Sequence, residues 1–371
     1  MNRSYNFSAG PAALPVEALE AARDELLDFQ GSGMSIMEQS HRGANYDGVH
    51  NEAIDLLTEL LGIPETHQVL LLQGGATQQF ALIPMNFLPE GGKASYMVTG
   101  AWGQKAFKEA QVVAAARNAT VQLANPGGVT GEFTSLPDRA EGLEGSAYLH
   151  VTSNETIHGV QYDSLYGSTY PECGALPLVC DMSSDFLWQP TDLSRFDLAY
   201  AGAQKNIGPS GVVVVIVRKE WMNAGNTSIP NIFRYGVHGD KNSLLNTPPT
   251  FSIYMIRNVL RVLKSSGGLS AVKERNAAKA ARLYGVLDAR PEFYQCPVNT
   301  KDRSAMNVVW RLPNEELEKS LIGEAADLGM SGLKGHRSVG GIRASIYNAV
   351  PMDWVEHLAQ FLESFAEKHG A

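Results

Sequence analysis

The sequence predicts an α/β fold, with a large domain built on a mostly parallel central sheet sandwiched by helices and a smaller α+β domain at the C-terminus. Two observations support this prediction. Apolar runs of strand length alternate with helical patterns over roughly the first 260 residues, which is typical of a sheet covered on both faces. The 371 residues, of which 44% are hydrophobic, are also enough to form more than one core.

Six short segments are predicted to be strands of the central sheet. Each is rich in apolar and β-branched residues, and several are continuously apolar, as strands buried on both faces are. In chain order they span residues 68–74, 94–100, 146–153, 176–181, 197–202 and 211–217. Two helices are predicted before them. Residues 16–29 carry apolar side chains at helical spacing next to Pro15, and residues 49–63 repeat that pattern and end at Gly62.

A second pattern begins after roughly residue 260, where longer helical segments are interrupted by two short strands. The predicted helices span residues 253–268, 268–289, 315–330 and 354–370, and the predicted strands span 306–312 and 340–347. This alternation indicates a smaller α+β unit. We therefore predict a large domain over residues 16–262 and a small domain formed by residues 1–15 and 263–371.

The overall composition limits the classes of partner. A net charge of −9 disfavours nucleic acid, whose phosphates require a basic surface, so an anionic substrate would need a local cluster of cations. No apolar run reaches the ~20 residues that a membrane helix needs, and residues 1–11 lack the apolar core of a signal peptide. The three cysteines have no metal-ligand spacing. We therefore expect a cytoplasmic protein without a metal site and without a membrane or nucleic-acid partner.

Two features at predicted strand ends are typical of ligand contacts. In residues 73–80 a strand runs into Gly74 and Gly75 and a helix pattern follows, so free backbone N–H groups there could bind a phosphate. A plain strand–helix turn explains the same residues equally well. Trp102 follows the next strand, where an aromatic ring could stack on a planar ligand, although a tryptophan in the core or at its rim is the more common case.

A carboxylate and a lysine end two further strands. Asp181 closes an apolar strand, where it either bonds to Ser183 or Ser184 or pairs with a buried protonated nitrogen of a ligand. Lys205 follows the strand at 197–202, and a lysine in a partly desolvated site loses its proton more readily and becomes a nucleophile. Pyridoxal phosphate is the common cofactor that uses all four features, because it has an aldehyde, a ring nitrogen, a planar ring and a phosphate.

Cationic side chains gather in two other segments. They are His41 and Arg42 in residues 41–43, and His336, Arg337 and Arg343 in residues 335–345. A surface position is the usual explanation for any one of them. Arg343, however, lies within an apolar alternation, so its guanidinium needs a buried partner or a ligand. Several such groups in an acidic protein indicate a substrate with two or three negative charges.

Seven stretches resemble a known family from end to end of the chain. They are NFSAGPAALP (6–15), MEQSHRG (37–43), QGGATQQF (73–80), NETIHGV (154–160), YAGAQKNIGPSG (200–211), NTPPTF (246–251) and GHRSVGGIRASIYNA (335–349). By these motifs the chain resembles the phosphoserine aminotransferases, a family of class V, fold-type I aminotransferases that depend on pyridoxal 5'-phosphate. The resemblance implies ping-pong transfer of an amino group from L-glutamate to 3-phosphooxypyruvate, which gives O-phospho-L-serine and 2-oxoglutarate in serine biosynthesis.

The resemblance also assigns contacts to the cofactor ring. Lys205 would form a Schiff base with the cofactor and then move the proton between the substrate α-carbon and C4′. Asp181 would pair with the ring nitrogen and keep it protonated. Trp102 would stack on the ring, and Thr156 would hydrogen-bond the 3′-oxygen.

The phosphate of the cofactor would be held by residues from two subunits. The backbone at Ala76 and Thr77 and the side chain of Gln204 would contact it from one chain. Asn246 and Thr247 would reach it from the neighbouring chain. The resemblance therefore implies a homodimer with shared active sites.

Substrate recognition would depend on the cationic side chains. Arg343 would bind the substrate α-carboxylate. The distal phosphate, or the side-chain carboxylate of glutamate, would be bound by His41 and Arg42 and, from a subunit loop, by His336 and Arg337. The resemblance further implies a second reaction, the formation of 4-phosphohydroxy-L-threonine in pyridoxal phosphate biosynthesis.

Other functions are compatible with parts of this pattern. A cysteine desulfurase would need a cysteine on a mobile loop, whereas Cys180 lies in a predicted core strand and Cys173 and Cys296 lack a suitable setting. An alanine–glyoxylate-type transaminase has no use for so many cations. A nucleotide-binding protein would need a GxGxxG motif or a P-loop, and the sequence has neither at residues 73–80. A non-catalytic carrier of the cofactor is the remaining alternative.

Overall fold

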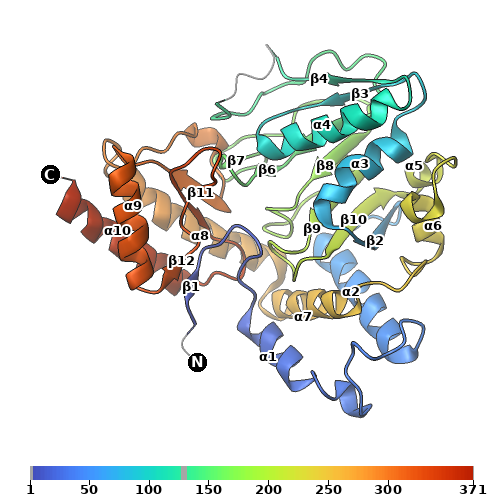
Figure 1. Cartoon of the computed structure of the whole chain (residues 1–371), viewed down its shortest axis with the longest axis horizontal. Coiled ribbons are helices and arrows are strands. Elements are labelled where there is room, and N and C mark those ends of the chain that lie inside the picture. Colours follow the sequence, from blue (N-terminus) through green and yellow to red (C-terminus); the bar gives the residue numbers. More distant parts are fainter. Residues whose placement is uncertain (1–2, 127–131, 371) are drawn as a thin grey trace.

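A seven-stranded sheet forms the centre of the computed structural model, which describes residues 3–126 and 132–370 (Figure 1). In spatial order its strands are β2 (His67–Gln73), β10 (Val212–Arg218), β9 (Leu198–Gly202), β8 (Leu178–Asp181), β5 (Leu149–Thr152), β3 (Lys93–Tyr96) and β4 (Thr120–Leu123). Strands β9, β8, β5, β3 and β4 run parallel to one another, and β10 is antiparallel to both of its neighbours. The predicted α/β fold with a mostly parallel central sheet is therefore confirmed.

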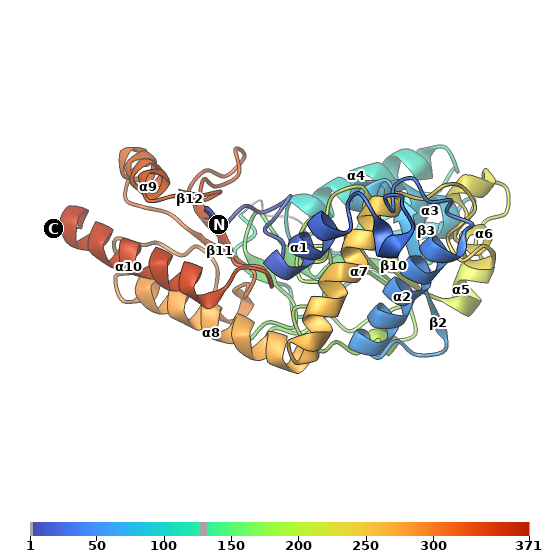
Figure 2. The same ribbon diagram turned by 90° about the horizontal axis from the view of Figure 1, so that it is seen from below.

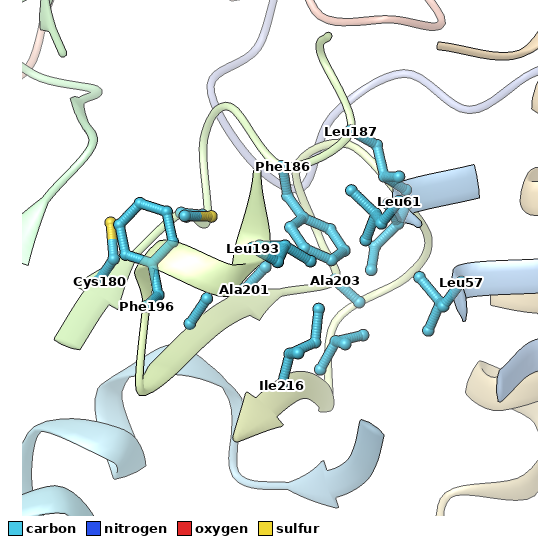
Figure 3. Close-up of a cluster of buried hydrophobic side chains, with 14 of the residues drawn as sticks. Leu57, Leu61, Cys180, Phe186, Leu187, Leu193, Phe196, Ala201, Ala203 and Ile216 are labelled. Atoms are coloured by element: carbon cyan, nitrogen blue, oxygen red, sulfur yellow. The ribbon is translucent and has the colours of Figure 1, made fainter. Parts of the chain in front are cut away.

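Helices cover both faces of this sheet (Figure 1). The helices of this part are α1 (Val16–Asp24), α2 (Ala44–Leu61), α3 (Gly75–Phe87), α4 (Ala101–Ala115), α5 (Lys219–Asn223), α6 (Tyr235–Asp240) and α7 (Thr250–Ser265). Alternate residues of β2 face opposite cores: Leu71 packs in the cluster that contains α2 and α7, and Leu70 packs in the one that contains α3 and α4. Figure 3 shows part of the first cluster, including Leu57 of α2 and Ile216 of β10. Burial on both faces explains why these strands read as continuous apolar runs.

The second part of the chain forms its own core beside the sheet (Figure 2). Its elements are α8 (Gly268–Asp288), β11 (Asn307–Trp310), α9 (Glu315–Asp327), β12 (Met330–Ser331), β13 (Ile342–Ser345) and α10 (Met352–His369), with β1 (Tyr5–Asn6) paired to β12. Phe7 and Ala13 pack into this core from the N-terminal segment. Helix α7 continues through residue 262 to Ser265. The division of the chain at residues 15/16 and 262/263 stays a prediction.

Two departures from the predicted elements have physical causes. The helix expected over residues 16–29 ends at Asp24. Leu26 and Leu27 beyond it are 39% and 84% exposed, so their burial does not stabilise a further turn. Strand β4 was not predicted, because it lies at the sheet edge and its half-exposed sequence, TVQL, forms no apolar run. The remaining short elements are two strands and four single-turn helices. They are β6 (Asn154–Glu155), β7 (Val160–Gln161), η1 (Phe29–Gly31), η2 (Leu193–Arg195), η3 (Asn231–Phe233) and η4 (Thr300–Asp302).

Among the helices in residues 3–126 and 132–370, none combines the length and the apolar character that a bilayer crossing requires.

Candidate active site

The first side of the site is the turn from β2 into α3. Gly74 and Gly75 have φ angles of 92° and 64°, which glycine adopts without strain. A Cβ at Gly74 would also collide with the side chain of Gln78, so the turn requires glycine. Helix α3 starts at Gly75, and Ala76 and Thr77 in its first turn line a cavity. The N-terminus of α3 therefore presents unpaired N–H groups and the positive end of a helix dipole to this cavity.

Lys205 occupies the turn after β9 and is 9% exposed. Its Nζ donates a hydrogen bond of 2.8 Å to Oγ1 of Thr156 and lies 5.3 Å from the centre of the Trp102 ring. Burial lowers the pKa of Lys205 to about 8, and the nearby carboxylates of Asp181 and Glu155 partly oppose that shift. A substantial fraction of this amine is consequently neutral near physiological pH, which a nucleophilic lysine requires.

Asp181 is the last residue of β8 and is buried. One of its oxygens, Oδ1, accepts hydrogen bonds from the backbone N–H, at 2.9 Å, and from the hydroxyl of Ser183. Burial raises the pKa of Asp181, whereas the charge of Lys205 and the bonds from Ser183 lower it. The expected bonds to Ser183 are therefore present, and they orient a buried carboxylate that favours a cationic partner. Its pairing with a ligand nitrogen stays a prediction.

Trp102 lies in the first turn of α4 and is held there by a buried carboxylate. Glu155 accepts the backbone N–H groups of Trp102, at 3.0 Å, and Gly103, at 2.7 Å. Gly100 allows this approach, because a Cβ on it would collide with Glu155. Glu155 immediately precedes Thr156, the hydroxyl partner of Lys205, so one short segment fixes both the ring and the lysine partner.

Arg343 reaches the same region from β13 of the second part. Its Nη1 donates to the carbonyl oxygen of Thr156 at 3.4 Å, while its Nε has no hydrogen-bond partner among the described residues. Burial lowers the pKa of Arg343, and no described carboxylate forms an ion pair with it. A guanidinium with an unpaired, buried donor next to a reactive lysine is suited to binding a carboxylate.

These groups surround one cavity of about 200 Å³. Nine of the predicted site residues line it: Ala76, Thr77, Trp102, Thr156, Asp181, Gln204, Lys205, His336 and Arg343. The cavity therefore unites a helix N-terminus, an aromatic ring, a buried carboxylate, a lysine and an arginine, which are the features predicted separately from the strand ends.

Five other predicted residues do not line this cavity. Arg42, Thr247 and Arg337 are exposed, and Asn246 donates a hydrogen bond of 3.0 Å to the side chain of Gln73. His41 is half-buried, and its Nε2 has no partner among the described residues. These five residues therefore lie outside the cavity lining, and their contacts with cofactor or substrate stay predictions.

Several residues of the site were not singled out from the sequence. Phe80 and Ile157 line the cavity, and Gly10 approaches Lys205 so closely that a Cβ there would lie 3.4 Å from Cγ of the lysine. Glu155 was missed although it lies in the NETIHGV stretch, because only the fold shows that its carboxylate meets the start of α4. Apolar lining residues carry no chemical signal that sequence reasoning can use.

Comparison with known proteins identifies the family. The family model for aminotransferase class-V matches residues 4–358. The chain belongs to the class-V aminotransferases. Within them this aminotransferase is 50% identical over 369 residues to phosphoserine aminotransferase of Lysinibacillus sphaericus (strain C3-41), with 99% of both chains covered. It is 46% identical to phosphoserine aminotransferase of Bacillus subtilis (strain 168) over the full length of both.

Solved structures give the same result for this aminotransferase. Phosphoserine aminotransferase from Bacillus circulans subsp. alkalophilus superposes with a TM-score of 0.93 at 48% identity and 99% coverage of both chains. The pyridoxal-phosphate-bound enzyme from Trichomonas vaginalis superposes with a TM-score of 0.89 at 36% identity, over 97% of this chain and 100% of that one. The predicted family and its pyridoxal phosphate cofactor are confirmed.

The residues of the cavity fit this cofactor. The start of α3 suits its phosphate, Asp181 suits a protonated ring nitrogen, and Lys205 suits its aldehyde. The indole Nε1 of Trp102 has no partner among the described residues, as expected for a ring that borders a ligand site.

Cofactor attachment should depend on pH through the titration of Lys205. The amine is protonated and unreactive below its pKa of about 8, so the attachment rate should rise roughly tenfold per pH unit below that value and level off above it. Stopped-flow mixing of cofactor-free enzyme with pyridoxal phosphate measures this rate. The control is the reaction of a free lysine derivative with pyridoxal phosphate. Its amine has the ordinary lysine pKa, and the titrations of the cofactor are the same in both reactions. Identical pH profiles for enzyme and control would contradict the expectation.

Proposed function

We propose that the enzyme is a phosphoserine transaminase. It would transfer the amino group of L-glutamate to 3-phosphooxypyruvate by a ping-pong reaction, giving 2-oxoglutarate and O-phospho-L-serine. The observation that carries this proposal is the cavity in which Lys205, Asp181 and Arg343 meet, in a chain half identical to enzymes named phosphoserine aminotransferase.

The residues of the cavity would have separate roles toward the cofactor and the substrate. Pyridoxal phosphate, when bound, supplies an electron sink that stabilises negative charge at the substrate α-carbon. Asp181 would keep the ring nitrogen protonated, and Trp102 and Thr156 would orient the ring and its 3′-oxygen. Ala76 and Thr77, by their backbone, and Gln204 would hold the phosphate. Lys205 would carry the proton from the α-carbon, since its amine lies in the same cavity and burial lowers its pKa to about 8.

The substrates share an α-carboxylate and a second, distal anion. Arg343 would bind the α-carboxylate, because it lines the same cavity as Lys205 and its buried Nε has no partner among the described residues. His336, which also lines the cavity, would bind the distal anion together with Arg337, His41 and Arg42. The net charge of −9 repels anions, so this local cluster is needed for recognition.

A homodimer with shared active sites would complete this arrangement. His41, Arg42, Asn246 and Thr247 lie outside the cavity of their own chain, so a second copy is the natural source of their contacts. Exposed apolar side chains in residues 26–37, among them Leu27 at 84% and Met37 at 53%, support a buried interface there. Light scattering that gave the 40.2 kDa mass of one chain would contradict this proposal.

Two pathways fit this chemistry. We propose serine biosynthesis as the principal one, and formation of 4-phosphohydroxy-L-threonine for pyridoxal phosphate biosynthesis as a second, because that product has the same α-carboxylate and phosphate. The three cysteines are unpaired, which supports a reducing compartment, the cytoplasm. Cell fractionation that recovered the enzyme outside the cytoplasm would contradict this location.

Single-turnover half-reactions test the substrates. L-Glutamate should convert the cofactor to its amino form, with the loss of visible absorption, and 3-phosphooxypyruvate should restore that absorption. Pyruvate, which lacks the phosphate, should restore it roughly 100-fold less efficiently, since losing charge-assisted bonds to the phosphate costs about 3 kcal/mol. Equal efficiency of the two oxo acids would show that the cationic cluster does not recognise a distal anion.

A further inference from the structure

Residues 335–341, which carry His336 and Arg337, form a closed loop before β13. The N–H of Gly335 donates to the carbonyl oxygen of Gly341 at 2.9 Å and closes its base. The N–H groups of Val339 and Gly340 donate to the carbonyl oxygen of His336 at 3.0 and 2.8 Å. We call this segment the 335–341 loop. Its own hydrogen bonds define its shape but not its position relative to the rest of the molecule.

Two charged residues from other elements hold the 335–341 loop in place. Arg311, just after β11, donates from Nη1 to the carbonyl oxygen of Val339. Its Nε donates to Oε1 of Glu318, in α9, at 2.8 Å. The other carboxylate oxygen, Oε2 of Glu318, accepts the backbone N–H of Gly341 at 3.2 Å. Arg311 and Glu318 therefore bind the loop at two points, and each contact is a charge-assisted hydrogen bond to the backbone.

Steric contacts support the same attachment. Gly340 and Gly341 have φ angles of 69° and 71°. A Cβ at Gly341 would lie 2.6 Å from Cδ of Arg311 and 2.8 Å from the carbonyl oxygen of Trp310, and one at Gly340 would lie 3.2 Å from Nη1 of Arg311. The loop thus uses glycine where its backbone passes closest to the arginine.

We propose that Arg311 and Glu318 are positioning residues that set the selectivity of the enzyme for substrates with a distal anion. Neither residue lines the cavity around Lys205, although Arg311 borders an adjoining cavity that His336 and Arg343 also line. Both bind the loop that carries His336 and Arg337 and act through it. This inference rests on the proposed function, in which those two residues bind the distal phosphate or carboxylate. Arg343, which every substrate uses, lies beyond the loop on β13 and is held separately by its backbone N–H bond to Leu333 at 2.8 Å.

The burial of Glu318 explains why the position of the 335–341 loop depends on the pair of Arg311 and Glu318. Its side chain is 9% exposed, whereas that of Arg311 is 43% exposed. A buried carboxylate that loses its cationic partner is strongly disfavoured, so the arginine keeps the carboxylate charged and the carboxylate orients the arginine. With either partner removed, the glycine-rich loop would sample many positions, and binding of a distal anion would have to order it again.

The test compares half-reactions of the complete, cofactor-loaded enzyme with three amino donors. L-Glutamate and O-phospho-L-serine have a distal anion, and L-alanine does not. Glu318→Gln and Gly341→Ala should each lower the efficiency with the first two roughly tenfold to a hundredfold, as small misplacements of binding groups do. Their efficiency with alanine should stay within about twofold. Arg282→Met is the matched control, because it removes an ion pair with Glu356 and Glu363 in the same part of the molecule, away from the loop.

The outcomes separate the possibilities. A loss of efficiency confined to L-glutamate and O-phospho-L-serine, with Arg282→Met unchanged, supports the inference. An equal loss of efficiency with L-alanine, or no loss in either variant, overturns it. Thermal melting identifies a variant that fails to fold, and the other variant then decides the test. If the wild-type enzyme itself shows no preference for glutamate or phosphoserine over alanine, the proposed function fails. If that preference is present but unaffected by the substitutions, only the positioning role fails.

Discussion

Replacement of Lys205 by alanine should abolish both the covalent attachment of the cofactor and transamination. Lys205 is the lysine that lines the cavity, with Nζ 2.8 Å from Thr156 and 5.3 Å from the Trp102 ring. Alanine offers neither the amine that bonds to the aldehyde nor the base that moves the substrate proton. Because base catalysis alone contributes about 10²–10⁴-fold and the covalent step is lost as well, the rate should fall by at least about 10⁴-fold.

Two measurements check the Lys205→Ala prediction. Absorption spectra should show cofactor that is bound but not linked to the protein, and the glutamate half-reaction should be undetectable on the wild-type timescale. Lys264→Ala is the control, since Lys264 pairs with Glu59 on the surface of α7 and should leave both readouts unchanged. A Lys205→Ala enzyme with the wild-type spectrum would rule out Lys205 as the attachment site.

Replacement of Asp181 by asparagine should have the second-largest effect. In the proposed function the buried carboxylate balances a protonated ring nitrogen, and asparagine would carry no charge to keep that nitrogen protonated. Truncating one partner of a buried ion pair costs about 3–5 kcal/mol, so the single-turnover rate with glutamate should fall by roughly 10²–10⁴-fold. The fold should survive, because the amide oxygen of asparagine still accepts the bonds from Ser183.

Ser183→Ala separates the charge of Asp181 from its orientation. That substitution removes the hydroxyl bond to Oδ1 but leaves the backbone N–H bond and the negative charge. We expect a loss of about 1 kcal/mol, or roughly fivefold in the same rate. Comparable losses in Asp181→Asn and Ser183→Ala would mean that orientation, and not charge, is what Asp181 provides.

The central sheet and the chemistry at its strand ends were predictable because they depend on local patterns. Each of the six predicted strands of the sheet overlaps an observed strand, since burial on both faces leaves an unbroken apolar run in the sequence. Asp181 and Lys205 stand out because a charge at the end of such a run is expensive to bury without a function. Parallel strands bring such ends to one edge, which explains why separate weak signals meet in one cavity.

Other features depend on contacts that no local pattern records. Glu155 gains its role only because β6 meets the start of α4, and Ile157 and Phe80 line the cavity as ordinary apolar residues. The end of α1 at Asp24 reflects missing packing around Leu27, whereas its sequence continues the helical pattern. The attachment of the 335–341 loop by Arg311 and Glu318 likewise joins two elements that are neighbours only in the fold.

Locating the lysine that bonds to the cofactor tests the proposed function most directly. The chain has a second buried lysine, Lys279, whose pKa burial lowers to about 7. Its Nζ, however, donates to the carbonyl oxygens of Ile346, Tyr347 and Val350, and it does not line the cavity with Trp102 and Asp181. Borohydride reduction fixes the C=N bond, and peptide mass spectrometry then identifies the labelled residue. The structure predicts label on Lys205 alone, and label on Lys279 or on any other lysine would contradict it.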